Sequence, residues 1–234
     1  ETAITLLIIY VIFRLLHHDK QVLINLMTNM GDKQTLEDLK RPILHDFHVL
    51  ADQIGKKNDR LNNVIADIEK MALEDSLTQT GNRRLFEKEK AMHMSHGIRG
   101  MSICVVTLDL DNFKQVNDTH GHAVGDRMLF SFGKALKSIL RDSDSVYRIG
   151  GDEFIVILYS MDLDNMQHWY DRVVTQFNAE RARYRIKLDV HVGISAGASA
   201  FHPEDVSLYQ TILRADKALY KSKESGRGQI TVSE

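Results

Sequence analysis

The chain has 234 residues and an ordinary globular composition, with 43% hydrophobic and 26% charged residues. This length allows one or two domains and ample material for a core. The formal net charge of -2 excludes a bulk electrostatic footprint on nucleic acid, so any phosphate ligand must be held by a few placed cations. The single cysteine, Cys104, excludes a disulfide framework and fits a reducing compartment. Its apolar neighbours predict a packed core residue.

The first sixteen residues are strongly apolar and are followed by basic residues. The apolar run over 3–13 is too short to span a bilayer by itself, since about 20 residues are needed. It also lacks the basic leader and small-residue cleavage site of a signal peptide. Because Arg14 and Lys20 follow it, as on the cytoplasmic flank of a span, we interpret residues 1–16 as the C-terminal part of a transmembrane helix. A buried core helix is the alternative.

Residues 17–72 have mostly helical spacing, which predicts two helical pieces that are split near Gly31. From residue 50 on, apolar residues follow a seven-residue pattern that is typical of a parallel coiled-coil seam, and hence of a homodimer. One row contains Ile54, Leu61 and Ile68, and the other contains Leu50, Val64 and Met71, with Lys57 as its only break. Helix–connector–helix after a membrane span resembles a HAMP signal relay. A plain amphipathic stalk is the alternative.

Residues 73–234 alternate between strand and helix patterns. We expect strands over 101–110, 145–147, 154–158, 188–196 and 229–232, and helices over 112–118, 124–140, 164–183 and 207–225. Two β-α-β units that share a sheet imply an α+β, ferredoxin-like domain. Its central sheet is expected to be mostly antiparallel, with flanking helices on one face.

Two glycines and two acids occupy the predicted hairpin between 145–147 and 154–158. Gly150 and Gly151 allow a tight turn, and Asp152 and Glu153 follow at once. Asp109 ends the strand over 101–110, which is commonly a neighbour of such a hairpin in a split β-α-β sheet. Hard oxygen ligands at one rim suit Mg²⁺, which also binds substrate phosphates. A solvated hairpin tip is the alternative.

Other nucleotide and metal sites lack their sequence patterns. No Gly-x4-Gly-Lys-Ser/Thr loop and no Gly-x-Gly-x-x-Gly run occurs, which disfavours the P-loop and Rossmann folds. The eleven histidines fall into no His-x3-His or cysteine-containing set, which disfavours zinc.

Several motifs together resemble the GGDEF family of diguanylate cyclases. The resemblance covers about residues 73–234. It is carried by the strings DLDNFKQVNDTHGHAVGD at 109–126 and GGDEF at 150–154, with an opening motif at 75–84 and a closing motif at 215–227. The opening motif departs from the family pattern at 79–81, where Gln-Thr-Gly replaces a Gly-Leu-Pro-like centre.

The resemblance implies an enzyme that condenses two GTP into cyclic di-GMP and two pyrophosphates. Two Mg²⁺ ions per active site are expected, with Mn²⁺ as an alternative. Their ligands would be Asp109, the carbonyl of Leu110, Asp152 and Glu153. Asp152 and Glu153 are the expected catalytic residues, and Glu153 either binds metal or helps to deprotonate the attacking hydroxyl. The alternative for Glu153 is a surface acid in the turn.

The resemblance also assigns substrate-binding residues. Asn117 and Asp126 would bind the guanine edge, where a carboxylate accepts from two N–H groups that adenine lacks. The triphosphate would be neutralised by Lys114, Lys223 and Arg227, and backbone approach would be allowed by Gly150 and Gly151. Phe113 is included with this group, although a core role is its alternative. Taken one at a time, Lys114, Lys223 and Arg227 are also typical of cations on a solvated surface.

Each domain holds one GTP, so the resemblance implies a homodimer in which two domains face each other. Arg141 and Asp144, with five residues between Asp144 and Gly150, resemble the family's inhibitory product site, with Arg172 as a secondary contact. A surface ion pair is the alternative. The implied location is the bacterial inner membrane, with the membrane contacted through the N-terminal helix and the catalytic domain in the cytoplasm. Other functions stay open, namely a catalytically silent receptor for GTP or cyclic di-GMP, and a nucleotidyl transferase or adenylyl-type cyclase.

Overall fold

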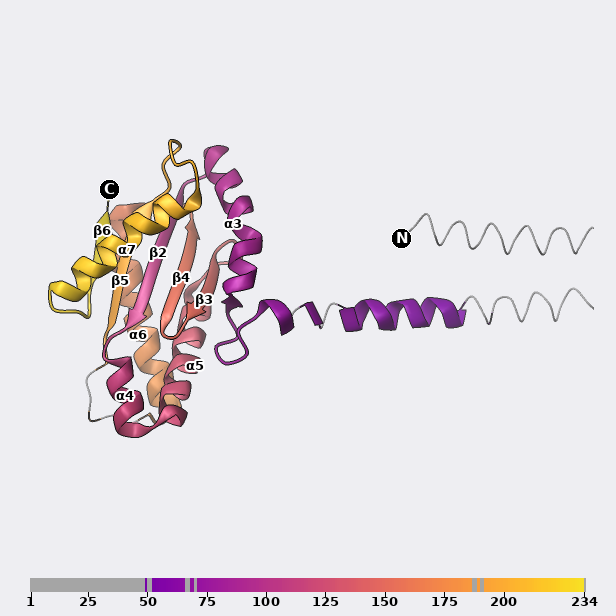
Figure 1. Ribbon diagram of the computed structural model, residues 1–234, viewed down its shortest axis with the longest axis horizontal. Coiled ribbons are helices and arrows are strands. Elements are labelled where there is room, and N and C mark those ends of the chain that lie inside the picture. Colours follow the sequence, from indigo (N-terminus) through magenta and orange to yellow (C-terminus); the bar gives the residue numbers. More distant parts are fainter. Residues whose placement is uncertain are drawn as a thin grey trace, which may run out of the picture. The chain divides into compact units, whose positions relative to one another are not determined.

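The computed structural model describes residues 49, 52–65, 68–69, 71–186, 189 and 192–233 (Figure 1). The chain divides into two units, residues 1–66 and 67–234. The expected transmembrane end at 1–16 and the expected first part of the stalk, up to residue 48, lie outside the described residues. Within the described part, no helix has both the length and the apolar character that a membrane span needs.

The second half of the predicted stalk is helical wherever it is described, over 52–65, 68–69 and 71–73. The described apolar residues of the predicted seam, Ile54, Leu61, Val64, Ile68 and Met71, are exposed on the single chain, with exposed fractions of 57% for Leu61 and 59% for Ile68. Apolar side chains at this spacing fit a partner helix. Their pairing with a second chain stays a prediction.

Six strands form one mixed sheet in the order β1-β3-β4-β2-β5-β6. They are β1 (Gly81–Asn82), β2 (Ile103–Leu110), β3 (Ser145–Gly150), β4 (Glu153–Tyr159), β5 (Ile194–Ala200) and β6 (Ile230–Ser233). The four central strands pair antiparallel, whereas β1 and β6 run parallel to their neighbours β3 and β5. The α+β class with a mostly antiparallel sheet is confirmed, and β2 lies beside the hairpin strand β4 as predicted.

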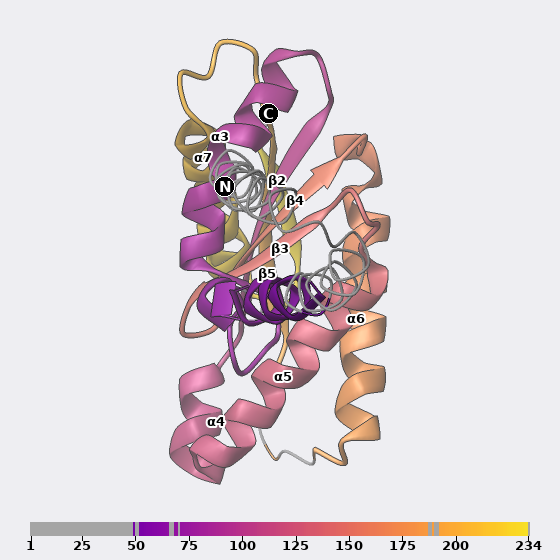
Figure 2. The ribbon, with the colours of Figure 1, turned by 90° about the vertical axis from the view of Figure 1, so that its right-hand side faces the viewer.

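Helices cover both faces of this sheet, so the prediction that they cover one face was wrong. The helices are α3 (Arg83–Ile98), α4 (Phe113–His120), α5 (His122–Ile139), α6 (Met166–Arg183), which follows the short 3-10 helix η1 (Leu163–Asn165), and α7 (Leu208–Glu224). Figure 2 shows α3 and α7 on one side of the strands and α5 and α6 on the other. The physical reason lies in β2, where Val105 packs into the α3–α7 core and Val106 into the α5–α6 core. Such a continuous apolar run, without polar alternation, is typical of a strand buried on both faces.

The strand predicted over 188–196 lies further along the chain, because β5 begins at Ile194 and ends at Ala200. Its sequence, ISAGASA, is rich in small residues, which have low strand propensity. The reason for small residues is the close approach of α7. A Cβ atom at Gly197 would lie 2.1 Å from the carbonyl oxygen of Ala215. Tertiary packing therefore overrides local propensity here.

A buried polar chain fixes the hairpin strands to α3. His93 is fully buried, with Nδ1 2.6 Å from the Tyr159 hydroxyl and Nε2 2.7 Å from the Tyr147 hydroxyl. Tyr147 donates to Glu89 at 2.5 Å, so its oxygen accepts from Nε2–H of His93, and Nδ1 accepts from Tyr159. Burial lowers the pKa of His93, which favours this neutral form. Both strands that lead to and from the acidic turn are thereby anchored.

The predicted core role of Cys104 is confirmed. The side chain has no exposed surface and lies among the α5–α6 core residues. Burial raises the pKa of the Cys104 thiol to about 12, so it stays protonated and unreactive at neutral pH.

Candidate active site

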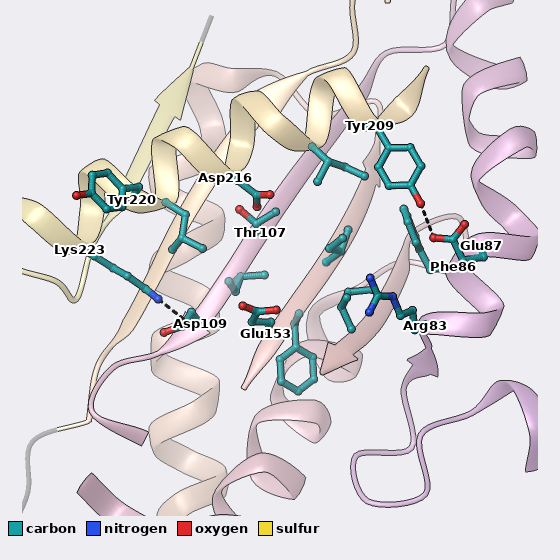
Figure 3. Close-up of a pocket in the computed structure, with 16 residues that line it drawn as sticks. Arg83, Phe86, Glu87, Thr107, Asp109, Glu153, Tyr209, Asp216, Tyr220 and Lys223 are labelled. Carbon is teal, nitrogen blue, oxygen red and sulfur yellow. Dashed lines mark hydrogen bonds and ion pairs between the residues drawn. The ribbon is translucent and has the colours of Figure 1, made fainter. Parts of the chain in front are cut away.

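The predicted acids meet at the end of β2. Asp109 lies directly opposite Glu153 in the β2–β4 pairing. Because side chains alternate along a strand, both point to the α3–α7 face of the sheet. They line a cavity of about 430 Å³ between these helices, and Figure 3 shows them side by side at its lower end. The expectation that the first core strand and the hairpin bring their acids to one rim is confirmed.

The glycine turn places Asp152 beside this pair. Gly151 has φ of +54°, a conformation that favours glycine, whereas a Cβ atom at Gly150 would meet no other atom within 4 Å. The Arg148 side chain fixes the turn by donating from Nε to the carbonyl of Gly151 at 2.9 Å. Gly151 is therefore required by the turn itself, whereas Gly150 leaves open space over the backbone.

The electrostatics of the cluster favour a bound cation. Burial raises the pKa of Asp109, although the Lys223 ammonium lies 2.8 Å from its carboxylate and opposes the rise. Burial, and next the neighbouring charge of Asp109, raise the pKa of Asp152. Two half-buried acids that repel each other are stabilised by positive charge between them. Lys223 supplies part of that charge in this structure.

The donor set fits a metal that is held only partly by protein. Among the described residues, no three His, Cys, Asp or Glu side chains converge closely enough to hold an ion by themselves. Mg²⁺ usually keeps several waters and is bound through one or two carboxylates together with substrate phosphates. The pair Asp109 and Asp152 matches that requirement. The metal roles of Glu153 and of the Leu110 carbonyl stay predictions.

The two residues predicted to bind guanine lie on adjacent helices. Asn117 on α4 packs directly over Gly125, in the first turns of α5, where a Cβ atom would lie 1.9 Å from its Oδ1. Asp126 is the next residue and is exposed. Phe113 packs against the core and also lies close to Gly125. Gly125, to which the sequence analysis assigned no role, is thus needed for Asn117 to lie beside Asp126.

The three predicted phosphate cations occupy different positions. Lys223 contacts Asp109 as described above, and Lys114 is exposed on the first turn of α4. Arg227 lies in the loop after α7 and is close enough to lower the pKa of Asp109. Lys223 and Arg227 are thus brought to the acidic rim.

The cavity also contains residues that the sequence analysis did not assign to the site, among them Thr107, Asp216 and Arg83. Figure 3 shows Asp216 beside Thr107, with Arg83 toward the α3 side. Burial raises the pKa of Asp216 and the nearby charge of Glu153 adds to the rise, whereas the adjacent Thr107 hydroxyl opposes it. Asp216 and Lys223 are seven residues apart, which puts them on one face of α7. This spacing was the sequence signal that could have identified Asp216 as a site residue.

The predicted inhibitory residues form a turn before β3 and no ion pair. The Asp144 carboxylate accepts from the backbone N–H of Arg141 and of Tyr159, both at 3.0 Å. Among the described residues, the Arg141 side chain has no salt bridge, so the alternative of a surface ion pair with Asp144 is not what is observed. Arg172 is exposed on α6.

A family model described as "Diguanylate cyclase, GGDEF domain" matches residues 72–229. The chain belongs to this family. The GGDEF domain also resembles the solved coiled coil and GGDEF domain of DgcB from Caulobacter crescentus in complex with c-di-GMP. That likeness has a TM-score of 0.65 and 26% identity, and it covers 79% of this chain and 97% of the other.

Curated relatives of this GGDEF domain differ in their stated activity. Diguanylate cyclase DgcS of Shewanella oneidensis is 33% identical over 69% of this chain and 53% of its own length. Cyclic di-GMP phosphodiesterase NbdA of Pseudomonas aeruginosa is 34% identical over 72% of this chain but only 22% of its own length. The matched region therefore spans about half of the cyclase and a minor part of the phosphodiesterase.

The repulsion between Asp109 and Asp152 predicts a stability effect. Since the folded state raises the pKa of Asp152, its ionised form destabilises the fold above that pKa, and the effect disappears as the pH falls through it. We expect Asp152→Asn, at neutral pH without divalent metal, to raise the melting temperature by about 2–4 °C. Added Mg²⁺ should stabilise the wild type more than the variant. A lower melting temperature for Asp152→Asn would contradict the electrostatic account.

Proposed function

We propose that this protein is a diguanylate cyclase that condenses two GTP into cyclic di-GMP and two pyrophosphates. The observation that carries the proposal is the convergence of Asp109, Asp152 and Glu153 with Lys223 at one rim of the sheet. Asn117 and Asp126, on the consecutive helices α4 and α5, support guanine as the base. An acidic cluster with cations at its edge suits phosphoryl transfer, which depends on positioning and charge neutralisation.

In this mechanism the 3′-hydroxyl oxygen of one GTP attacks the α-phosphorus of the other. The new O–P bond forms as the bond between the α-phosphorus and the bridging oxygen breaks, and pyrophosphate leaves with that electron pair. In this proposal Glu153 would take the hydroxyl proton, and Lys223 and Arg227 would neutralise the departing phosphates. Mg²⁺ at Asp109 and Asp152 would supply further charge stabilisation when bound. A second attack of the same kind closes the ring.

Removal of either turn acid tests the proposal. Asp152→Ala and Glu153→Ala should each lower cyclic di-GMP formation by at least about 100-fold, because the transition-state charge loses its stabilisation. The measurement is product separation after incubation with Mg²⁺ and either GTP or ATP. Asp164→Ala is the matched control, since this exposed acid lies in η1, beyond the opposite end of β4. Near wild-type turnover in both acid variants would reject the assignment.

The same assay separates the alternatives. The phosphodiesterase among the relatives shows that a protein containing this kind of region can carry another stated activity. A silent receptor would bind GTP or cyclic di-GMP without product, and an adenylyl-type transferase would use ATP. Retention of both turn acids favours the cyclase.

We further propose that the enzyme acts as a homodimer at the bacterial inner membrane, with the GGDEF domain in the cytoplasm. One domain holds one GTP, so two domains must face each other, and a coiled coil raises their effective concentration. The exposed seam over 54–71 supports this assembly. The apolar sequence over 1–16 supports the anchor, which fractionation of cells expressing the chain would test.

Charged substitutions in the seam test the dimer. Leu61→Lys with Ile68→Lys should disrupt pairing and make specific activity depend on protein concentration. Analytical ultracentrifugation and activity are measured together across a dilution series. Asp59→Lys, on the same exposed helix but outside both apolar rows, is the control. A monomeric double variant with full activity would exclude the dimer requirement.

We also propose product feedback through Arg141 and Asp144, with Arg172 as a further contact. Because the Arg141 side chain forms no salt bridge with any described residue, its guanidinium can bind guanine or phosphate bidentately. The Asp144 carboxylate holds the backbone of Arg141 by accepting a hydrogen bond from its N–H.

Feedback predicts a change in progress curves. Arg141→Ala should weaken inhibition by cyclic di-GMP by about 5- to 150-fold, the effect of losing one bidentate contact of about 1–3 kcal/mol. The initial rate should stay near wild type, because the acidic rim is separate. Arg183→Ala, on the exposed end of α6, serves as the control. Equal inhibition constants for Arg141→Ala and wild type would remove Arg141 from the proposal.

A further inference from the structure

Three chain segments that are distant in sequence meet at the carboxylate of Asp111. This residue follows β2 directly, two positions after Asp109, and is 3% exposed. Its Oδ1 accepts from the Ser195 hydroxyl on β5 at 2.6 Å, and its Oδ2 accepts from the backbone N–H of Gly228 at 2.9 Å. Its own N–H donates to the carbonyl of Gly193 at 3.0 Å. Asp111 therefore joins the end of β2 to the start of β5 and to the loop after α7.

The junction leaves no spare volume. A Cβ atom at Gly193 would lie 2.7 Å from Oδ2 of Asp111 and 3.2 Å from the Cα atom of Gly228. Both Asp111 oxygens are buried and already accept hydrogen bonds from the protein. Its burial and the close packing around Oδ2, rather than the number of hydrogen bonds, restrict the access of a metal ion to this carboxylate. Its role differs from that of Asp109, although both belong to the same short motif.

The loop that Asp111 holds carries Arg227. Gly226, Arg227 and Gly228 all have positive φ, at +114°, +63° and +59°. For Arg227 this left-handed conformation is unfavourable and must be held by its surroundings. Two hydrogen bonds hold it, from the N–H of Arg227 to the carbonyl of Ser222 at 3.0 Å and from Gly228 to Asp111. Loss of the second bond would release the C-terminal side of the arginine.

We propose that Asp111 is a positioning residue that fixes the Arg227 loop beside the acidic rim, so that Arg227 binds the β- and γ-phosphates of GTP. Asp111 acts through the loop and does not touch the nucleotide. The inference rests on the proposed function, because it takes Arg227 as a phosphate cation. The structural support is geometric: the loop of Arg227 follows α7, whose Lys223 lies 2.8 Å from Asp109, and its Gly228 donates to Asp111, two residues after Asp109.

The test compares two nucleotides on the full chain. The first is a GTP analogue that lacks the 3′-hydroxyl and cannot react, and the second is GMP, which lacks the β- and γ-phosphates. Calorimetry should find that Asp111→Ala and Arg227→Ala each lower the affinity for the GTP analogue by about 10- to 100-fold, because a charge-assisted contact is lost. The affinity for GMP should change by less than about 2-fold, because the guanine contacts remain.

Asp111→Asn is the conservative variant. Its amide oxygen can accept from Gly228 while its NH₂ donates to the Ser195 hydroxyl, so affinity for the GTP analogue should return to within about threefold of wild type. A general folding defect in Asp111→Ala would lower the affinity for both nucleotides. In that case Gly193→Ala is the deciding variant, because its methyl group displaces the same carboxylate. It should lower the affinity for the GTP analogue and leave the affinity for GMP unchanged.

The outcomes distinguish the phosphate role of Arg227 from the positioning role of Asp111. Wild-type affinity of Arg227→Ala for the GTP analogue would reject the phosphate role in the proposed function, and the positioning role with it. A selective loss in Arg227→Ala without one in Asp111→Ala would reject the positioning role alone. Equal losses of affinity for the GTP analogue and for GMP, in both Asp111→Ala and Gly193→Ala, would also overturn the positioning role.

Discussion

The pairing register of β2 with β4 sets where the side chains of Asp109 and Glu153 point. Seven residue pairs join the two strands, from Ile103 opposite Tyr159 to Asp109 opposite Glu153. A slip of one residue would turn Asp109 toward the α5–α6 core and bring Leu108 to the rim, because side chains alternate along a strand. Burial of both faces of β2 makes such a slip costly. The hydrophobic core thus specifies the geometry of a polar site.

Helix α7 supplies the positive side of the same site. Its position depends on the small residues of β5, since Gly197 allows the helix backbone to come within contact of the strand. Lys223 can reach Asp109 only because the helix lies that close to the sheet. The Asp111 junction then controls the loop in which α7 ends, so strand and loop together determine where the cations lie.

Arg148 connects the acidic turn to the start of the GGDEF domain. Its Nη1 lies 3.0 Å from Asp75 Oδ1, while its Nε donates to Gly151 in the turn. Burial acts to raise the pKa of Asp75, but hydrogen bonds from Thr78 and Arg148 outweigh it, and the pKa is lowered. Asp75 follows the last helical residues, 71–73, in the chain. One ion pair therefore couples the segment after the predicted stalk to the turn that holds Asp152.

The sequence by itself determined the family, the acidic turn and the strand end that carries Asp109, because turn glycines and terminal acids are local signals that hardly depend on distant packing. The family resemblance likewise singled out Asn117, Asp126, Lys223 and Arg227. The second helical layer, the start of β5 and the roles of Asp111, Gly125 and Asp216 were decided only by the tertiary structure. Each depends on which distant segments touch. Small residues on β5 make sense only once α7 is packed on it, and Asp111 differs from Asp109 only because Gly228 and Ser195 surround it.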